Sequence, residues 1–258
     1  MKKFPISVCM VVGAEAHRIE GALKSVAGWA GEIIVVVNDH VTDGTDAIAL
    51  KYGAKVSREP WRGHILGKQS ASDKCSQPWI LCLDADEVVS PELRDEIQAL
   101  IESAAPPHAA YEFPRCTYYC GRWIRHGDWY PDHVQRLWRR DDFRWAGEEP
   151  HARLQVNGTV GRLRSDLLHF SNEHIGRQIA KIAPYHADFV RLRVASGRPV
   201  GMVELGLRPA WRFLRAYFFR CGFLDGWRGF YIAALSAFST ATRYALVREA
   251  QVNRRDKP

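Results

Sequence analysis

Apolar residues in the first third of the chain are gathered into short runs that polar segments separate. Apolar runs occupy residues 6–12, where Ser7 is the one polar residue, and residues 33–37 and 79–83, and residues 54–57 form a shorter candidate strand. Runs of this length without alternating polar positions are typical of strands that are buried on both faces of a parallel sheet. The pattern therefore predicts four strands of such a sheet.

Helical patterns lie between these runs. Ile19, Leu23 and Val26 recur on one face of a helix over residues 16–26. Ser90 followed by proline is typical of a helix start, with serine as the N-cap and proline in the first helical position. Strands that alternate with helices predict an α/β fold with a mostly parallel, Rossmann-like sheet and flanking helices.

The pattern changes after residue 104. Residues 105–172 combine short strand patterns with many aromatic residues, and each ring is more simply explained as core than as a ligand-stacking surface. Residues 174–194 form a helical segment bent by Pro184. We expect one domain over residues 1–172, divided into halves 1–104 and 105–172, and a helical, basic and aromatic region over residues 173–258.

Composition restricts the partners. The net charge of +7 and the isoelectric point near 9.2 indicate an anionic partner, for which nucleic acid, a membrane surface and phosphorylated substrates compete. The six cysteines follow no disulfide or zinc spacing, which favours a reducing cytoplasm. Residues 229–242 carry no charge, but this run falls short of the roughly 20 residues that span a bilayer. The apolar segment near the N-terminus is better explained as the first strand than as a signal peptide.

Three carboxylates follow the fourth strand directly. Asp84, Asp86 and Glu87 come where the apolar run ends, and open α/β sheets bind their ligands at that end of the strands. Asp84 and Asp86 could both reach one hard cation, and such a cation would neutralise a diphosphate. The alternative is a solvated acidic turn before the helix that starts at Ser90.

A basic residue enters the next candidate helix. Residues 60–68 form a glycine-punctuated loop that ends in Lys68. A lysine at a helix start can meet phosphate oxygens together with backbone amides, and we favour Lys68 over Arg62 for this role. A solvated surface lysine is an equal alternative.

Three ordered motifs resemble those of family 2 glycosyltransferases with the GT-A fold. They are residues 6–12 followed by Ala14 and Glu15, residues 32–39 leading into Thr-Asp-Gly-Thr at 42–45, and Leu-Asp-Ala-Asp-Glu at 83–87. Beyond them, Trp-Tyr-Pro-Asp at 129–132, Arg136-Leu137, Leu-Leu-His at 167–169 and Gly-Phe-Leu-Asp-Gly at 222–226 resemble the bacterial branch of β-1,4-glucosyltransferases of the lipopolysaccharide inner core. The resemblance covers nearly the whole chain.

The resemblance implies an inverting transfer of a hexose, glucose, from a UDP-sugar to a glycolipid or oligosaccharide acceptor of the lipopolysaccharide core. Residues 1–104 would be the nucleotide half and residues 105–172 the acceptor half of the catalytic domain. A Mg²⁺ or Mn²⁺ ion would bridge the two phosphates. Implied nucleotide-sugar contacts are Ala14, Glu15, Asp39 at the base, Lys68, Asp84 at the ribose and Asp86, and implied metal ligands are Asp86 and His169. A buried structural histidine is the alternative for His169.

The catalytic base cannot be assigned directly from the resemblance, because the related enzymes carry Val-His-Glu where this chain has Pro150-His151-Ala152. Another carboxylate must then accept the proton. Asp132 and Glu149 are equal candidates, with Glu148 behind them. Asp132 follows paired aromatic residues and a proline, where desolvation could raise its pKa toward the useful range.

A rival hypothesis is a basic membrane- or nucleic-acid-binding protein on a nucleotide-binding scaffold without catalytic activity. Its support is the charge and the interleaved aromatics of the C-terminal third, but it leaves the ordered carboxylates without a role. For the enzyme we expect no nucleic-acid partner. We expect a cytoplasmic protein bound peripherally to the inner face of the membrane, through the arginines of residues 208–228 and an amphipathic helix that carries Tyr231, Leu235 and Phe238. Transfer to a polyprenyl phosphate is an alternative within the enzyme class.

Overall fold

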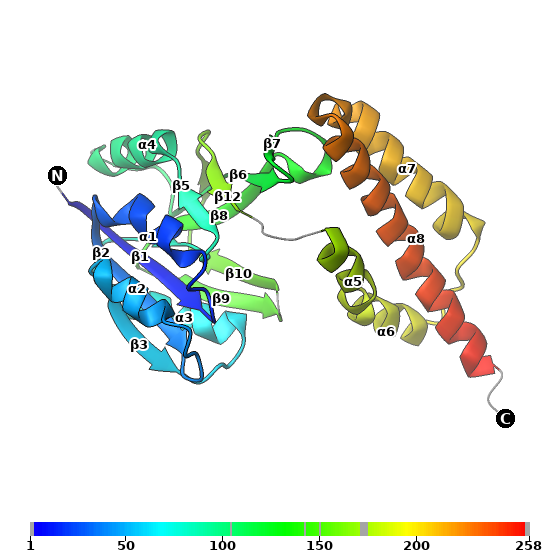
Figure 1. The fold of residues 1–258 in the computed structure, drawn as a ribbon, viewed down its shortest axis with the longest axis horizontal. Coiled ribbons are helices and arrows are strands. Elements are labelled where there is room, and N and C mark those ends of the chain that lie inside the picture. The colour runs from blue at the N-terminus through cyan, green and yellow to red at the C-terminus, as the bar shows by residue number, and fades with distance from the viewer. Residues whose placement is uncertain (1–2, 104, 142, 150, 171–174, 256–258) are drawn as a thin grey trace. The chain divides into compact units, whose positions relative to one another are not determined.

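A computed structural model describes residues 3–103, 105–141, 143–149, 151–170 and 175–255. The chain forms two compact units. Unit 1 comprises Met1–Cys116 and Asp132–Phe170, and unit 2 comprises Thr117–Pro131 and Ser171–Pro258 (Figure 1). The boundaries expected at residues 104 and 172 both fall outside the described residues. Residues 117–131, which the sequence analysis assigned to the acceptor half, pack with the C-terminal helices.

The sheet of unit 1 begins with the four strands that the sequence predicted. They are β1 (Phe4–Val12), β2 (Ala30–Asn38), β3 (Lys55–Glu59) and β4 (Trp79–Cys82), and they pair in parallel in the order β3-β2-β1-β4. The order then continues as β8-β6-β12-β5. Antiparallel pairs join β8 to β4 and β6, and β12 to β5. These strands are β5 (Glu87–Val89), β6 (Ala110–Tyr119), β8 (Asp132–Arg139) and β12 (Leu167–His169).

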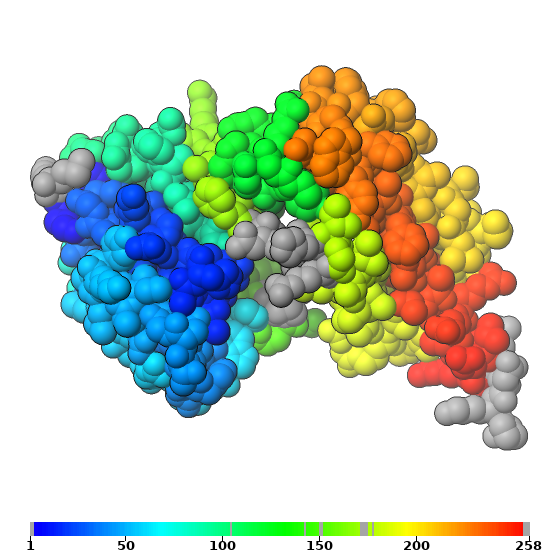
Figure 2. All heavy atoms as spheres, in the orientation of Figure 1, coloured from blue at the N-terminus to red at the C-terminus, as the bar shows by residue number. Residues whose placement is uncertain are grey.

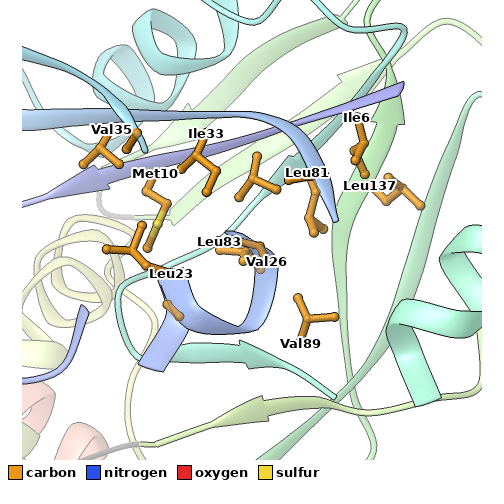
Figure 3. Packing of buried hydrophobic residues seen from close by; sticks show 14 of the residues in the cluster. Ile6, Met10, Leu23, Val26, Ile33, Val35, Leu81, Leu83, Val89 and Leu137 are labelled. Atoms are coloured by element: carbon orange, nitrogen blue, oxygen red, sulfur yellow. The ribbon is translucent and has the colours of Figure 1, made fainter. Parts of the chain in front are cut away.

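Helices cover both faces of this sheet, because neighbouring residues of a strand point to opposite sides. Val8 and Met10 of β1 pack with α1 (Ile19–Ala27), α2 (Thr45–Lys51) and α4 (Pro91–Glu102) on one face. Figure 3 shows Met10, Leu23, Val26 and Leu83 in this core. Cys9 faces the other side, toward α3 (His64–Asp73) and the separate hairpin of β9 (Phe143–Glu148) and β10 (His151–Val156). Each fully buried leucine or isoleucine contributes about 1.5–3 kcal/mol relative to an exposed one.

The predicted helix start at Ser90 is confirmed. Its Oγ accepts a hydrogen bond of 3.1 Å from the backbone N–H of Leu93, and Pro91 occupies the first turn of α4. The same Oγ donates to the carbonyl of Asp166 at 2.7 Å, which ties the helix start to the segment that leads into β12. The α/β fold with flanking helices and a helical C-terminal region is therefore as expected.

Unit 2 is mainly helical. Its elements are β7 (Arg122–Ile124), η1 (Gly127–Trp129), α5 (Ile175–Tyr185), α6 (Ala187–Ala195), η2 (Val203–Leu207), α7 (Arg208–Leu214), η3 (Arg215–Phe219), η4 (Gly222–Asp225) and α8 (Trp227–Arg255). The remaining strand, β11 (Val160–Arg162), belongs to unit 1. The bent segment expected over residues 174–194 is thus two helices, with the break at His186, two residues after Pro184. His174 lies outside the described residues.

Two close approaches hold the helices of unit 2 together. A Cβ atom on Gly229 would lie 1.8 Å from the carbonyl oxygen of Gly222, so η4 and α8 approach at a distance that only glycine permits. The buried carboxylate of Asp225 accepts hydrogen bonds from the backbone N–H groups of Arg125 and His126. Helices α7 and α8 lie side by side (Figures 1 and 2). No helix in the described part of the chain is both long enough and apolar enough to cross a membrane.

Candidate functional site

A cavity of about 920 Å³ opens in unit 1 at the carboxyl ends of the parallel strands. Gly13 follows β1, Asn38 ends β2, and Asp84 and Asp86 follow β4, and all of them line the cavity. Parallel strands bring these segments to one edge of the sheet although the sequence separates them widely. This is the edge at which the sequence analysis expected a ligand.

Two cations hold Asp84. The Nζ atom of Lys68 lies 2.9 Å from Oδ1, and the guanidinium of Arg136 donates to Oδ2. Arg136 reaches this position because β8 runs antiparallel beside β4. Burial alone would raise the pKa of Asp84, but Arg136 and Lys68 outweigh that effect and hold this pKa well below its usual range. Asp84 is therefore a carboxylate whose charge is already balanced.

Glu87 orients the basic wall of the cavity. Its side chain is fully buried, and Oε1 accepts hydrogen bonds from Arg136 at 2.8 Å and from Arg115 at 3.2 Å. Its second oxygen, Oε2, accepts the backbone N–H of Asp84 at 3.0 Å. A buried carboxylate with this many donors fixes the two guanidinium groups, and both of them line the cavity.

Asp86 has different partners. Its Oδ2 lies 3.2 Å from Nη1 of Arg18 and 3.5 Å from Nε2 of His169, which β12 carries. Burial would raise the pKa of Asp86, but His169 and Arg18 lower it below its ordinary value. The structure thus brings Asp86 and His169 together, as the resemblance implied for a shared metal site.

The donor set of Asp86 and His169 fits a divalent ion only if a ligand completes the coordination. Among the described residues, no group of three or more His, Cys, Asp or Glu side chains is arranged to hold a metal. Mg²⁺ commonly takes one or two carboxylates together with substrate phosphates and water, rather than a complete protein cage. Two protein ligands beside a basic cavity are compatible with that arrangement.

The remaining expected nucleotide contacts lie in different environments. Glu15 lines the cavity and forms an ion pair with Arg18, whereas Ala14 is exposed beside Gly13. Asp39 is 53% exposed, pairs with His40 at 3.5 Å, and is absent from the cavity lining, where Asn38 is found instead. The polar end of β2 that faces the cavity is thus one residue earlier than the sequence analysis expected.

The three candidate bases also differ. Asp132 accepts a hydrogen bond of 2.6 Å from Nη2 of Arg115 and keeps 44% of its side chain exposed, so the aromatic residues before it do not desolvate it. Glu148 is exposed at the end of β9. The side chain of His151 and all of Pro150 lie outside the described part of the chain.

Glu149 binds the start of a helix. Its two carboxylate oxygens accept the backbone N–H groups of His64 at 2.9 Å and Ile65 at 2.8 Å, the first residues of α3. Burial would raise the pKa of Glu149, but these two hydrogen bonds outweigh it and lower the pKa. A carboxylate held in this way is a poorer proton acceptor and a good helix cap.

Sequence reasoning missed most of the basic and aromatic wall. The cavity is lined by Arg18, Arg115 and Arg136. Apart from Glu15, which is close to Arg18 in the sequence, the carboxylates that bind these arginines come from distant segments of the chain. Trp145 also lines it, with its ring 5.4 Å from Nζ of Lys68 and its Nε1 3.0 Å from Oγ of Ser72. The Arg136-Leu137 pair was a motif of the resemblance, but no local pattern marks Arg18 or Arg115.

The fold is similar to that of GT-A glycosyltransferases. The structure is similar to crystal structures of residues 1–349 of TarS from S. aureus, with a TM-score of 0.50 at 16% identity, covering 98% of this chain and 92% of that chain. For the same protein in complex with UDP-GlcNAc the TM-score is 0.52 at 15% identity, covering 96% of this chain and 91% of that chain.

The sequence gives the family. Residues 7–161 match the family described as Glycosyl transferase family 2. An uncharacterized glycosyltransferase of Rickettsia typhi is 30% identical over 99% of this chain and 90% of its own length. The lipopolysaccharide core biosynthesis glycosyltransferase LpsC of Rhizobium meliloti is 30% identical over 95% of this chain and 94% of its own length. The chain therefore belongs to glycosyl transferase family 2 and is a glycosyltransferase.

Proposed function

We propose that this enzyme transfers glucose from a UDP-sugar to a lipopolysaccharide-core or related glycolipid acceptor, with inversion at the anomeric carbon. The observation that carries the proposal is the cavity at the carboxyl edge of the parallel strands, where Asp84 and Asp86 face a basic wall. The cationic side chains of this wall can donate charge-assisted hydrogen bonds to the oxygens of a sugar diphosphate.

The identity of the sugar donor is inferred from the charged and polar residues of the cavity. Hydrogen bonds to the diphosphate would come from Arg18, Lys68 and Arg136, and the side-chain amide of Asn38, next to Asp39, would contact the nucleotide base. TarS, which shares the fold, has been crystallised with UDP-GlcNAc, and this supports a uridine nucleotide here. Asp86 and His169 would hold a Mg²⁺ or Mn²⁺ ion, which supplies Lewis-acid stabilisation of the leaving diphosphate when it is bound.

The acceptor is inferred from the relatives. LpsC, which aligns with nearly the whole chain, is named as an enzyme of lipopolysaccharide core biosynthesis. Such an acceptor is an anionic glycolipid, and it suits a chain with a net charge of +7. It would also place the enzyme at the cytoplasmic face of a membrane, which is consistent with the exposed aromatic residues of unit 2.

Asp132 is the base that we favour. The acceptor hydroxyl oxygen would attack the anomeric carbon, its proton would pass to the Asp132 carboxylate, and the bond from the anomeric carbon to the β-phosphate oxygen would break to release UDP. The ion pair with Arg115, which lines the cavity, orients the Asp132 carboxylate. Glu149 has both oxygens engaged at the start of α3, and Glu148 is exposed at the end of β9, so both rank behind.

The test is a transfer assay with a panel of radiolabelled UDP-sugars, Mg²⁺ or Mn²⁺, and lipopolysaccharide truncated in its core. We expect label in the glycolipid with UDP-glucose and loss of that label in the Asp84→Asn variant. The Asp95→Asn variant, altered on the exposed face of α4, is the matched control. Absence of both transfer and slow donor hydrolysis with either metal, combined with tight, salt-sensitive binding of nucleic acid, would favour the rival hypothesis.

A further inference from the structure

Unit 2 contains a cavity of its own, of about 700 Å³. Helices α5, α7 and α8 form most of its wall, together with η2 and Trp129 of η1. Four arginines line it: Arg208, Arg212, Arg215 and Arg243. Among the described residues that line it, none is acidic. Every residue that forms it belongs to unit 2, so the cavity is distinct from the donor site in unit 1.

One buried carboxylate contacts two of these arginines, and its single negative charge does not neutralise their combined positive charge. Asp128, whose side chain is 2% exposed, lies 2.8 Å from Nε of Arg212, 2.8 Å from Nη2 of Arg215 and 3.5 Å from Nη1 of Arg220. Three guanidinium groups therefore share a single negative charge. Concentrated like charges in a partly buried place need a counter-charge.

Arg208 and Arg243 add further positive charge. Neither forms an ion pair with a carboxylate among the described residues; aromatic rings hold them instead. The Arg243 guanidinium lies 4.9 Å from the ring centroids of Phe189 and Tyr244, and that of Arg208 lies 5.9 Å from Tyr244. The Nε atoms of Arg243 and Arg215 are buried and have no hydrogen-bond partner in the described part of the chain.

The crowding also affects the ionisation of two groups. Burial lowers the pKa of Arg212, and its like-charged neighbours Arg215, Arg243 and Arg220 lower it further, although Asp128 acts in the opposite direction. Burial and the nearby Arg243 likewise lower the pKa of His186. An anion in the cavity would relieve the repulsion among the arginines.

The rest of the lining defines the shape of the ligand. Ser236 and Ser239 place hydroxyl groups on the cavity side of α8, and the Oγ atom of Ser239 lies 2.7 Å from Nε2 of His186. The neighbouring Thr240 donates its hydroxyl to the carbonyl oxygen of Ser236 at 2.8 Å. Apolar side chains, among them Trp211 and Ile232, complete the wall. Guanidinium forks and hydroxyl groups together suit the oxygens of a phosphate, whereas the apolar surface suits a hydrocarbon or sugar body.

We propose that the cavity of unit 2 binds a phosphate monoester carried on a lipid or sugar body. The further assignment of this ligand as the phosphate-bearing part of the acceptor rests on the proposed function, whereas the binding of a phosphate monoester does not. The acceptor would then be recognised mainly by residues outside the segment 105–172 from which acceptor contacts were expected, with Trp129 as the lining residue from within that segment.

The test is isothermal titration of the full-length chain with n-octyl phosphate, inorganic phosphate and n-octyl glucoside. We expect one molecule of octyl phosphate per chain, and about tenfold weaker binding in the Arg243→Gln variant, which removes a charge not paired with Asp128. The Arg243→Lys variant should keep most of the affinity, because it keeps the charge. Arg191→Gln, an equally charged change on the exposed side of α6, is the matched control and should leave the affinity unaltered.

Several outcomes separate this site from the donor site. Octyl phosphate should bind equally in the presence of UDP with Mn²⁺ and to the Asp86→Asn variant. Binding of inorganic phosphate as tight as that of octyl phosphate would identify a soluble phosphate as the ligand, and clearly tighter octyl phosphate binding would identify an amphiphile. Equal affinities of wild type and a folded Arg243→Gln variant, or octyl glucoside binding as well as octyl phosphate, would overturn the proposal. If no assay detects sugar transfer but octyl phosphate still binds, the proposed function is wrong and the phosphate site is retained.

Discussion

The Nζ atom of Lys68 lies 2.9 Å from Oδ1 of Asp84, and Arg136 holds the other carboxylate oxygen. Asp86, two residues later, contacts Arg18 and His169 instead. The two carboxylates of the Asp-x-Asp motif therefore have separate partners. Asp84 is neutralised by the protein itself, and Asp86 is the one whose histidine neighbour makes it suitable for a metal.

The first prediction concerns Asp86. The Asp86→Asn substitution should lower the transfer rate by about 100-fold or more, because it removes the carboxylate that we propose as a metal ligand. The fold should be retained, since the side chain lies at the end of a strand and outside the core. Initial rates and a thermal unfolding curve measure both effects. A rate above a tenth of wild type would show that the assignment of Asp86 is wrong.

His169 gives a second prediction with a different measurement. If His169 helps to hold the ion, His169→Ala should raise the Mn²⁺ concentration needed for half-maximal rate by about tenfold, by the loss of one ligand. The rate at saturating Mn²⁺ should change less. An unaltered dependence on metal concentration would leave His169 as a structural partner of Asp86, 3.5 Å away.

The parts of this fold that depend on neighbouring residues could be predicted from the sequence. The parallel strands β1, β2 and β4 contain apolar runs, the cap of α4 is a local serine–proline pair, and the edge that carries Asp84 and Asp86 follows from the strand ends. The basic wall could not be predicted, because Arg18 lies 68 residues from Asp86 and Arg136 lies 52 residues from Asp84. Such pairs form only when the sheet assembles.

The polar side of α8 shows a second limit. Ser236, Ser239, Thr240 and Arg243 look like the solvated side of an amphipathic helix when the sequence is considered alone. In the structure they line the cavity of unit 2, because α5 and α7 pack around that side. The residues of α8 that are fully buried include Ile232, Ala233 and Val247. A helical periodicity identifies a face, but the partner helices decide whether that face meets water, core or a ligand.

A third prediction separates the candidate bases. Asp132→Asn should lower the rate at saturating substrates by about 100-fold with little change in the KM for the donor, because it removes the proton acceptor. Glu149→Ala should keep the rate within a few-fold and destabilise the protein by about 1 kcal/mol, because it removes the cap of α3. Glu148→Ala, on the adjacent exposed residue, is the control. The reverse pattern would make Glu149 the base.

A fourth prediction concerns stability and pH. Burial alone would raise the pKa of Glu32, but hydrogen bonds from Ser7, Lys55 and Ser76 lower it from 4.5 to about 2. A lowered folded-state pKa gives stability that is present above the unfolded pKa and is lost as pH falls toward the folded one. Glu32→Gln should therefore cost about 2 kcal/mol at neutral pH.

The difference between wild type and Glu32→Gln should shrink as pH falls below about 4.5. Urea unfolding at neutral pH and at successively lower pH measures this trend, with Glu249→Gln on the exposed side of α8 as a control that should show no comparable loss at neutral pH. A difference that stays constant down to the acid limit of folding would show that the Glu32 hydrogen bonds do not stabilise its ionised form.

The last prediction is that unit 2 binds an anionic membrane surface. Several of its aromatic side chains are exposed: Trp211, Phe218, Phe219, Phe223, Trp227, Phe230 and Phe238. Exposed aromatic residues suit the interfacial layer of a bilayer, and each arginine close to anionic lipid contributes about 1 kcal/mol to binding.

In flotation with anionic vesicles we expect binding at low salt and release at high salt. Replacing both Phe218 and Phe219 by serine should weaken binding strongly, whereas Leu50→Ser, at an equally exposed apolar residue of α2, should not. Arg243→Gln should still float, because Arg243 lies in the cavity wall and not among these aromatic residues. Failure of the wild-type chain to float with anionic vesicles at low salt would contradict the prediction.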